Sequence, residues 1–238
     1  MSVAAAFFDV DGTLVGRHIV HQFMHIRRRL LSPALRPLWT GVFLAKAPYY
    51  LVLDKVSRTR LNEVFYRNYA GMSSAAVRSG VESCFHEVIL PNLFPQGRVC
   101  IAEHRAAGRR IVLATGSIDF IIKPLADLLG ADDVFAPRLI ERAGRFTGEL
   151  DGPAVGHHEK ARRIRVYAES HDIDLGSSFA YGDSIADLPM LELVGHPCVI
   201  NPDKALSSAA AQRGWPIQHW SVSATNGRGR QPIAARSG

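Results

Sequence analysis

The feature that most restricts the fold of this chain is an apolar run at residues 3–8, which leads directly into the sequence DVDGT at positions 9–13. A short apolar run without alternation is typical of a strand buried on both faces of a parallel sheet. Alternate side chains of a strand point to the same side, so Asp9 and Asp11 are expected to reach one space at the strand's carboxyl end. Open α/β folds bind their ligands at this edge, and we therefore predict an α/β fold with a site there.

The aspartate pair also fits a simpler explanation, because Asp-Gly is a frequent signal for a tight turn. Two carboxylates at this spacing repel each other unless a cation neutralises them or one of them keeps a proton. Taken alone, the DVDGT sequence does not decide between a surface turn and a catalytic pair. Three later segments of the chain favour the catalytic pair.

The first of these segments is the sequence TGS at 115–117, which follows a predicted strand at 110–114 and opens a predicted helix at 118–129. A hydroxyl and backbone amides at the start of a helix can hold a phosphate, although the same residue types also serve as helix caps. The second segment is Lys160, near the start of a predicted helix at 157–171. An isolated lysine on a helix is usually exposed, so Lys160 gains meaning only together with the other segments.

The third segment is GDSIAD at 182–187. If a helix begins directly after Asp183, then Asp183 and Asp187 lie four residues apart at its start and point to one position. Carboxylate oxygens are the ligands that Mg²⁺ prefers, whereas helix capping would explain Asp183 alone. By contrast, His157 and His158 are neighbours on a helix and point in different directions, so a metal site made by them is disfavoured.

Between residues 17 and 94 the pattern is helical, whereas strand and helix patterns alternate before and after this segment. We predict a Rossmann-like parallel-sheet core from residues 1–16 and 95–221, with residues 17–94 as an all-helical insertion over the aspartates. Within the insertion, helices are expected around residues 33–54, 58–69 and 73–90, after a first helix that starts near His18. Residues 222–238 show no apolar period, and we expect a disordered basic tail there.

The most apolar part of the predicted insertion is the segment 38–53, which is short for a membrane span and is interrupted by Lys46 and Pro48. We expect it to pack as helices within the insertion, with docking on a membrane surface or on another subunit as the less favoured alternative. Cys84, Cys100 and Cys198 lack a paired spacing, which argues against a disulfide framework or a zinc site and favours the cytoplasm. The amino terminus also lacks the features of a signal peptide.

The net charge of +6 favours an anionic partner such as a small phosphorylated metabolite. The basic residues are scattered and are not interleaved with aromatic residues, so nucleic acid is not expected as a partner. A hydrophobic content of 47% with 21% charged residues is that of a soluble globular protein. The sequence gives no indication of an oligomeric state.

The four segments resemble, in this order, the four motifs of the haloacid dehalogenase-like phosphohydrolase superfamily. They are DVDGT, the strand that ends in Thr-Gly, the helix lysine Lys160 and GDSIAD. The resemblance spans the chain from Asp9 to Asp187. The helical insertion resembles a C1-type cap, and the hairpin expected at 138–150 is similar to one in the phosphoserine phosphatase-like branch. The resemblance implies a Mg²⁺-dependent phosphatase that works through an aspartyl phosphate.

The resemblance also implies roles for single residues. Asp9 matches the nucleophile, and Asp11 matches the general acid and base, with its backbone carbonyl as a further Mg²⁺ ligand. Asp183 would complete the metal ligands together with Asp9, while Asp187 would bind the ion through water or support the other ligands. This assignment makes all four aspartates part of one metal and phosphoryl-transfer site.

The phosphoryl group would be held by Thr115 and the nearby amides, including that of Gly116, with Lys160 balancing its charge. The position of His18 is usually a glutamate in phosphoserine phosphatases, and that of Gly12 is commonly a serine. His18 therefore becomes a candidate for contacting the leaving group. Further candidates on the insertion are His21, Arg58 and Arg60.

The sequence leaves several substrates open, among them histidinol phosphate, a sugar or glycerol phosphate and a lysophospholipid phosphate. A phosphotransferase or mutase on the same scaffold is an alternative, since an aspartyl phosphate can pass to acceptors other than water. A receiver-type signalling switch also combines an acceptor aspartate, Mg²⁺, a threonine and a lysine. The second aspartate and the long helical insertion favour an enzyme over the switch.

Overall fold

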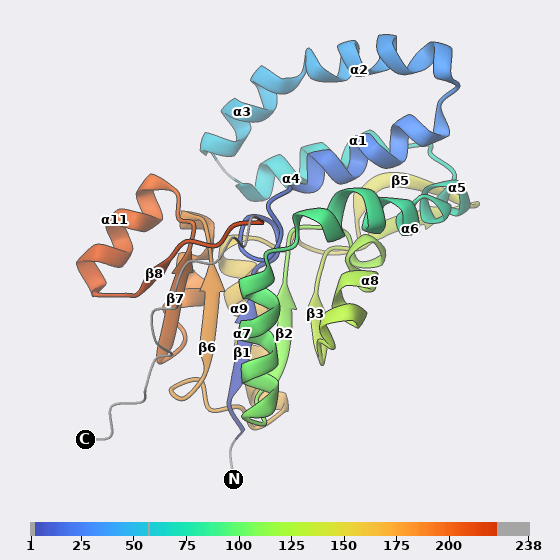
Figure 1. The fold of residues 1–238 in the computed structure, drawn as a ribbon. Helices are drawn as coiled ribbons and strands as arrows, with labels where there is room; N and C mark the ends of the chain where they lie inside the picture. Colours follow the sequence, from blue (N-terminus) through green and yellow to red (C-terminus); the bar gives the residue numbers. More distant parts are fainter. Residues whose placement is uncertain (1–2, 57, 223–238) are drawn as a thin grey trace, which may run out of the picture.

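The sheet that organises the fold has six parallel strands in the order β3-β2-β1-β6-β7-β8 (Figure 1). The structure is a computed structural model, which describes residues 3–56 and 58–222. β1 lies at the centre and pairs with β2 and β6, which confirms the predicted parallel α/β sheet. The strands are β1 Ala5–Phe8, β2 Arg110–Ala114, β3 Asp133–Phe135, β6 Phe179–Gly182, β7 His196–Ile200 and β8 Ile217–Gln218.

The apolar run of β1 contributes to two hydrophobic cores, one on each face of the sheet. Ala6 and Phe8 belong to a cluster that includes residues of α7 and α8, whereas Ala5 and Phe7 belong to a cluster with residues of α9, α10 and α11. Because both faces are covered, every position of this strand is apolar and fully buried. The covering helices are α7 Pro95–Ala106, α8 Asp119–Leu129, α9 His157–Ser170, α10 Leu188–Leu191 and α11 Lys204–Arg213.

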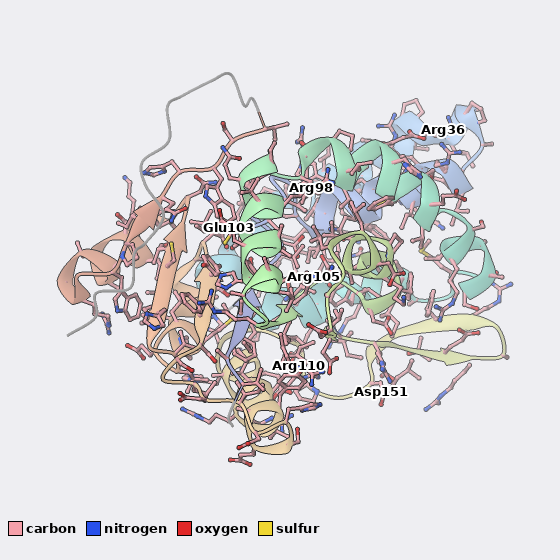
Figure 2. The ribbon with its side chains drawn as sticks, turned by 60° about the horizontal axis from the view of Figure 1, so that its bottom comes forward. Arg36, Arg98, Glu103, Arg105, Arg110 and Asp151 are labelled. Atoms are coloured by element: carbon pink, nitrogen blue, oxygen red, sulfur yellow. The ribbon has the colours of Figure 1, made fainter. Side chains whose placement is uncertain are left out.

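The helix α7 shows how helical spacing separates core from solvent. Its buried residues follow helical spacing along one face, whereas Arg98, Glu103 and Arg105 are exposed on the other faces (Figure 2). The buried residues are Gly97, Ile101 and His104. The helix therefore covers the sheet with an apolar stripe and presents its charged residues to water.

Helices also make up the insertion between β1 and α7, and Figure 1 shows α1 to α4 above the carboxyl ends of the central strands. The predicted helical segments contain more breaks than expected, including one at residues 45–46 and a π-helical turn at η3. The division into a cap and a core stays an interpretation. The helices are α1 Ile19–Leu30, η1 Pro33–Leu35, α2 Arg36–Leu44, α3 Ala47–Val56, α4 Arg58–Tyr66, η2 Arg67–Tyr69, α5 Ser74–Ser79, α6 Val81–Cys84, η3 Phe85–Ile89 and η4 Leu90–Asn92.

An aromatic cluster holds the insertion together and joins it to the rest of the molecule. The ring of Phe23 on α1 lies within 5.5 Å of the rings of Phe65 and Tyr69, and Tyr69 contacts Phe146 at 6.3 Å between ring centres. Phe146 lies on the hairpin of β4 Leu139–Arg142 and β5 Arg145–Leu150, as predicted from the sequence. These rings belong to the same hydrophobic cluster as Phe8, so the insertion and the sheet share one core.

Three further expectations concern membrane-spanning helices, the cysteines and the end of the chain. No helix among residues 3–56 and 58–222 is long and apolar enough to cross a membrane. The three cysteines are free in the structure, with Cys84 and Cys198 buried. The predicted disordered tail lies, apart from Val222, outside the described residues.

Candidate functional site

The carboxylate of Asp9 lies at the end of β1 and is only 4% exposed. Its backbone amide donates to the carbonyl of Tyr181 at 2.9 Å, which extends the sheet pairing past the last strand residue. One carboxylate oxygen accepts from the ammonium of Lys160 at 2.5 Å, and the other accepts from the Thr13 hydroxyl at 3.0 Å. Asp9 is therefore held in one orientation at the carboxyl edge of the sheet.

Asp11 is held by a separate set of donors. The hydroxyls of Thr115 and Ser117 donate to one carboxylate oxygen at 2.9 and 2.8 Å, and the Gln22 side chain donates to the other oxygen at 3.3 Å. Thr115 and Ser117 follow β2, whereas Gln22 lies on α1 in the insertion. Asp11 thus connects the sheet edge to the insertion.

The turn after β2 differs in part from its expected role. The hydroxyl of Thr115 donates to Asp11 and accepts from the backbone amide of Ser117 at 2.9 Å, and its side chain is fully buried. Gly116 lines the cavity in front of the aspartates, and its carbonyl accepts a hydrogen bond from the Tyr66 hydroxyl. The role of Thr115 toward a phosphoryl group stays a prediction, because the hydroxyl is engaged with Asp11.

Lys160 on α9 is buried beside the aspartates, with 5% of its surface exposed. Its ammonium donates to Asp9 at 2.5 Å and to Asp187 at 2.7 Å, so it lies between two carboxylates from distant parts of the chain. Burial alone would lower the pKa of Lys160, but Asp187 and Asp9 raise it above its ordinary value. The lysine therefore stays charged, and it is not the exposed residue that an isolated helix lysine usually is.

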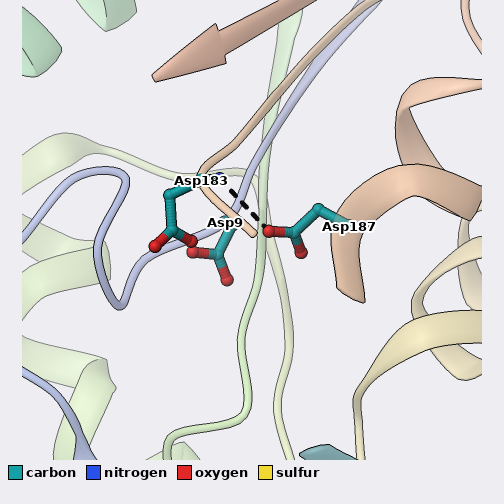
Figure 3. A group of neighbouring side chains, drawn as sticks. All are labelled: Asp9, Asp183 and Asp187. Atoms are coloured by element: carbon teal, nitrogen blue, oxygen red, sulfur yellow. Dashed lines mark hydrogen bonds between the residues drawn. The ribbon is translucent and has the colours of Figure 1, made fainter. Parts of the chain in front are cut away.

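Asp187 stabilises the turn that follows β6. This turn begins as a 3₁₀ helix, η5 Ile185–Asp187, and only then continues as α10. A carboxylate oxygen of Asp187 accepts from the backbone amides of Asp183 and Ser184 at 3.2 and 3.3 Å, as part of a capping box. Figure 3 shows the first of these bonds, with the carboxylates of Asp9 and Asp183 beside each other.

Three of the predicted metal ligands gather in this region. Carboxylate oxygens of Asp9, Asp183 and Asp187 lie within 4.8 Å of one another. Among the described residues, the group that could hold a metal ion contains neither His157 nor His158. An all-oxygen set of this kind fits the preference of Mg²⁺. The side chain of Asp11 does not belong to this group, and the binding of the ion by the backbone carbonyl of Asp11 stays a prediction.

The backbone at Gly12 makes this gathering possible. Gly12 has a φ of +103°, and a Cβ atom at this position would lie 2.0 Å from a carboxylate oxygen of Asp183. A larger residue would displace Asp183 and would also strain the backbone. The sequence indicated a tight turn at Gly12, but it did not reveal the close approach of Asp183.

Burial raises the pKa of Asp9 to about 6, although the charge of Lys160 acts in the opposite direction. The neighbouring carboxylates of Asp187 and Asp11 act in the same direction as burial and contribute to this raised pKa. A divalent cation among the carboxylates would lower it again, because the ion favours the charged form. The electrostatics of the cluster therefore suit a site that binds a cation.

A cavity of about 350 Å³ opens in front of the aspartates. Asp9, Asp11 and Lys160 line its inner end together with Asp183 and Asp187. The insertion covers it with residues of α1 to α4, and the predicted leaving-group contact His18 lines it as well, at the start of α1. A site of this kind can hold a small anionic ligand against the carboxylate of Asp9.

The other candidates on the insertion have different positions. His21 is exposed and interacts with the Arg17 side chain at 3.1 Å, outside the residues that line the cavity. Arg60 is exposed, and the side chain of Arg58 lies outside the described residues. The sequence did not single out Gln22 or Asn62, which are buried polar residues of the insertion near the site. Nothing in a helical pattern distinguishes such residues from ordinary surface amides.

Comparisons with known proteins agree with this geometry. A Mycobacterium tuberculosis protein named a probable phosphatase is 36% identical over 225 residues, which cover 91% of this chain and 75% of that protein. A histidinol-phosphatase of Neisseria meningitidis is 27% identical over 234 residues, covering 89% of this chain and 96% of that protein. A solved structure described as the phospho-aspartyl intermediate analogue of phosphoserine phosphatase has the same fold, with a TM-score of 0.66 and 18% sequence identity. The match covers 91% of this chain and 93% of that chain.

The sequence profile of one family matches most of the chain. The profile described as haloacid dehalogenase-like hydrolase matches residues 6–192, which include the DVDGT segment, the turn at 115–117, Lys160 and the GDSIAD segment. The order of these motifs and their convergence on one cavity are the same features that the resemblance predicted. The chain belongs to the haloacid dehalogenase-like hydrolase family.

Proposed function

We propose that this protein hydrolyses a phosphate monoester through an aspartyl phosphate on Asp9, with Mg²⁺ bound at the acidic cluster. The observation that carries the proposal is the convergence of Asp9, Lys160 and Asp183 at the inner end of one cavity. The same reaction class is supported by the relative that is named a probable phosphatase, whose alignment covers 91% of this chain.

In the proposed reaction, the carboxylate of Asp9, which Lys160 and Thr13 hold in place, supplies the nucleophile. An Asp9 oxygen forms a bond to phosphorus while the bond from phosphorus to the ester oxygen breaks. Asp11 gives a proton to the departing oxygen, and it later accepts a proton from the water that attacks the aspartyl phosphate. The three donors on Asp11 support this role because they fix its position, and the hydroxyls of Thr115 and Ser117 can also accept a hydrogen bond when Asp11 is protonated.

A phosphate dianion is repelled by a carboxylate nucleophile, so the site needs positive charge. Lys160 supplies one charge at 2.5 Å from Asp9. Asp9 and Asp183, with the backbone carbonyl of Asp11, would hold Mg²⁺, which neutralises the phosphoryl oxygens when it is bound. Asp187 would hold the other ligands in position, because its oxygens accept hydrogen bonds from Lys160 and from the backbone amides of Asp183 and Ser184.

The cavity favours hydrolysis of a substrate over a signalling role. A receiver-type switch accepts a phosphoryl group and keeps it, which does not require a space for a leaving group. Here the acceptor aspartate faces a cavity of about 350 Å³ that the insertion encloses. Transfer to an acceptor other than water stays an alternative, because the same cavity can hold an acceptor alcohol.

The test is turnover of p-nitrophenyl phosphate and of a panel of phosphometabolites by the purified protein with Mg²⁺. The panel includes histidinol phosphate, the substrate that the name of one relative indicates, and phosphoserine. We expect turnover that stops when Mg²⁺ is removed by a chelator. In Asp9→Asn, kcat should fall by a factor on the order of 10³ or more, while the circular dichroism spectrum stays that of the folded wild type. Activity of Asp9→Asn near that of the wild type would reject the proposed nucleophile.

A further inference from the structure

We propose that the cavity takes phosphate monoesters whose leaving group is an unbranched alkyl chain, as in single-chain amphiphiles. The inference rests on the proposed function and specifies its substrate class. The phosphoryl group would lie against Asp9 and Lys160, and the chain would extend along the wall that the insertion provides.

The wall of the cavity beyond the aspartates is mainly apolar. Residues of four successive helices of the insertion contribute to it, so an extended chain would contact apolar side chains along its length. Those that carry the argument are Ile19, Val20, Phe43, Leu44, Tyr50 and Leu51. Burial of methylene groups against such a wall is favourable, whereas burial of a charged amine or carboxylate against it is costly.

The polar side chain of Asn62 is placed at the catalytic end of the cavity. Asn62 is buried, and its amide nitrogen lies so close to Gly116 that a Cβ atom there would be 2.7 Å away. It therefore adjoins the turn after β2 and the phosphoryl end of the site. The arrangement provides polar groups near phosphorus and an apolar surface farther from it, which matches the polarity of an alkyl phosphate.

The apolar wall continues to the outer surface of the molecule. Leu44 at the end of α2 and Leu51 on α3 line the cavity, yet they are 51% and 63% exposed. Because both side chains line the cavity and are also largely exposed, they lie where the cavity meets solvent. A chain that exceeds the cavity would leave between them and would shield both side chains from water.

The first experiment measures kcat/KM for ethyl, butyl, hexyl and octyl phosphate, at concentrations at which octyl phosphate is monomeric. Each methylene that is buried against the wall is expected to raise kcat/KM by up to about fourfold. O-Phosphoserine is expected to fall below butyl phosphate, because its charged groups would meet apolar side chains. Equal values for ethyl and octyl phosphate would overturn the inference while leaving the proposed phosphatase in place.

The second experiment uses neighbouring residues of α3 as a matched pair. Leu51→Gln changes a residue that lines the cavity, whereas Val52→Gln changes one that is similarly exposed, at 61%, and is not among the lining residues. The ratio of kcat/KM for octyl over ethyl phosphate should fall about tenfold in Leu51→Gln and stay unchanged in Val52→Gln. Equal effects of both variants would assign the preference to the outer surface, as for membrane docking or a second copy, and would overturn the inference.

If the protein hydrolyses none of these esters, including p-nitrophenyl phosphate, this result rejects both the proposed function and the inference that rests on it. A protein that hydrolyses p-nitrophenyl phosphate but gains nothing from a longer chain would reject the inference alone. The two failures are therefore distinguishable in one set of assays.

Discussion

At the scale of single residues, the site depends on a close approach between Gly12 and Asp183. A Cβ atom at position 12 would lie 2.0 Å from the Asp183 carboxylate, and the φ of +103° is unfavourable for any other residue. We expect Gly12→Ala to cost about 1–3 kcal/mol of stability and to lower kcat/KM at least tenfold, because Asp183 must move. Urea unfolding and a p-nitrophenyl phosphate assay would measure the two effects.

The matched control for this variant is Gly108→Ala. Gly108 also has a positive φ, of +72°, but a Cβ atom there would meet nothing within 4 Å. Gly108→Ala should lose about 1 kcal/mol of unfolding free energy because of backbone strain, and its kcat/KM should stay unchanged. Equal losses of activity in the two variants would show that strain, and not the position of Asp183, explains the effect.

The residue scale also shows what the sequence could predict about the site. Asp9, Lys160, Asp183 and Asp187 each follow from a motif at a strand end or helix start, and the structure brings all four together. The contact from Gln22 to Asp11 could not be predicted, because it depends on how α1 is oriented over the sheet. That orientation results from packing between distant segments, which local patterns do not encode.

At the scale of the elements, His104 joins α7 to β6 and makes the stability of the fold depend on pH. Its Nε2 lies 2.8 Å from the Tyr181 hydroxyl, and its Nδ1 accepts from the Arg109 guanidinium at 3.1 Å. Burial, together with the charge of Arg109, lowers the pKa of His104 to about 4. The folded protein therefore keeps this histidine neutral at pH values where the unfolded chain protonates it.

The sign of the effect follows from proton binding. Between pH 6.5 and pH 4 the unfolded state binds the proton and the folded state does not, so stability is full above this window and falls as the pH falls through it. The loss from this residue between pH 7 and pH 5 should be about 2 kcal/mol. We expect the difference in unfolding free energy between these two pH values to shrink by about this amount in His104→Gln.

Urea unfolding of the wild type and of His104→Gln at both pH values measures this difference, and Gln keeps a side chain that can hydrogen bond to Tyr181. The same pH dependence in both proteins would assign the acid sensitivity to other groups. No pattern in the sequence indicated that a histidine on the buried face of α7 is part of the core.

At the scale of the whole molecule, the acidic cluster is assembled from segments that lie far apart in the chain. Asp9 directly follows β1, whereas Asp183 and Asp187 lie in the turn after β6. Their carboxylates repel each other, so an ion that binds them stabilises the folded state by mass action. At 100 times its dissociation constant Mg²⁺ should add about 2.7 kcal/mol, which raises the melting temperature by roughly 5–10 °C.

Thermal unfolding with and without Mg²⁺ tests this prediction. Asp183→Asn should lose most of the shift, whereas Asp151→Asn, a change at an exposed aspartate outside the cluster, should keep all of it. A shift that is equal in the wild type and in Asp183→Asn would mean that Mg²⁺ acts elsewhere on the surface.

The whole fold could be predicted in outline because the order of strands and helices follows from local apolar patterns. The shared core was not predicted, because the aromatic cluster of Phe23, Phe65 and Tyr69 joins the insertion to the sheet only after the chain has folded. The cavity depends on the same packing, since its wall combines helices that are separate in the sequence. The apolar segment 38–53 was predicted to pack within an insertion over the aspartates, but no local pattern indicated that Phe43, Leu44 and Leu51 would line the same cavity as Asp9.

The most direct test of the account is rapid mixing of Asp11→Asn with p-nitrophenyl phosphate and Mg²⁺. The p-nitrophenolate group leaves without a proton, whereas hydrolysis of the aspartyl phosphate needs Asp11 as a base. We predict a burst of p-nitrophenolate equal to the enzyme concentration, followed by slow turnover, with the phosphoryl group on Asp9 in the quenched protein. A phosphoryl group on another residue, or the same burst when Asp9→Asn is added to the variant, would contradict it.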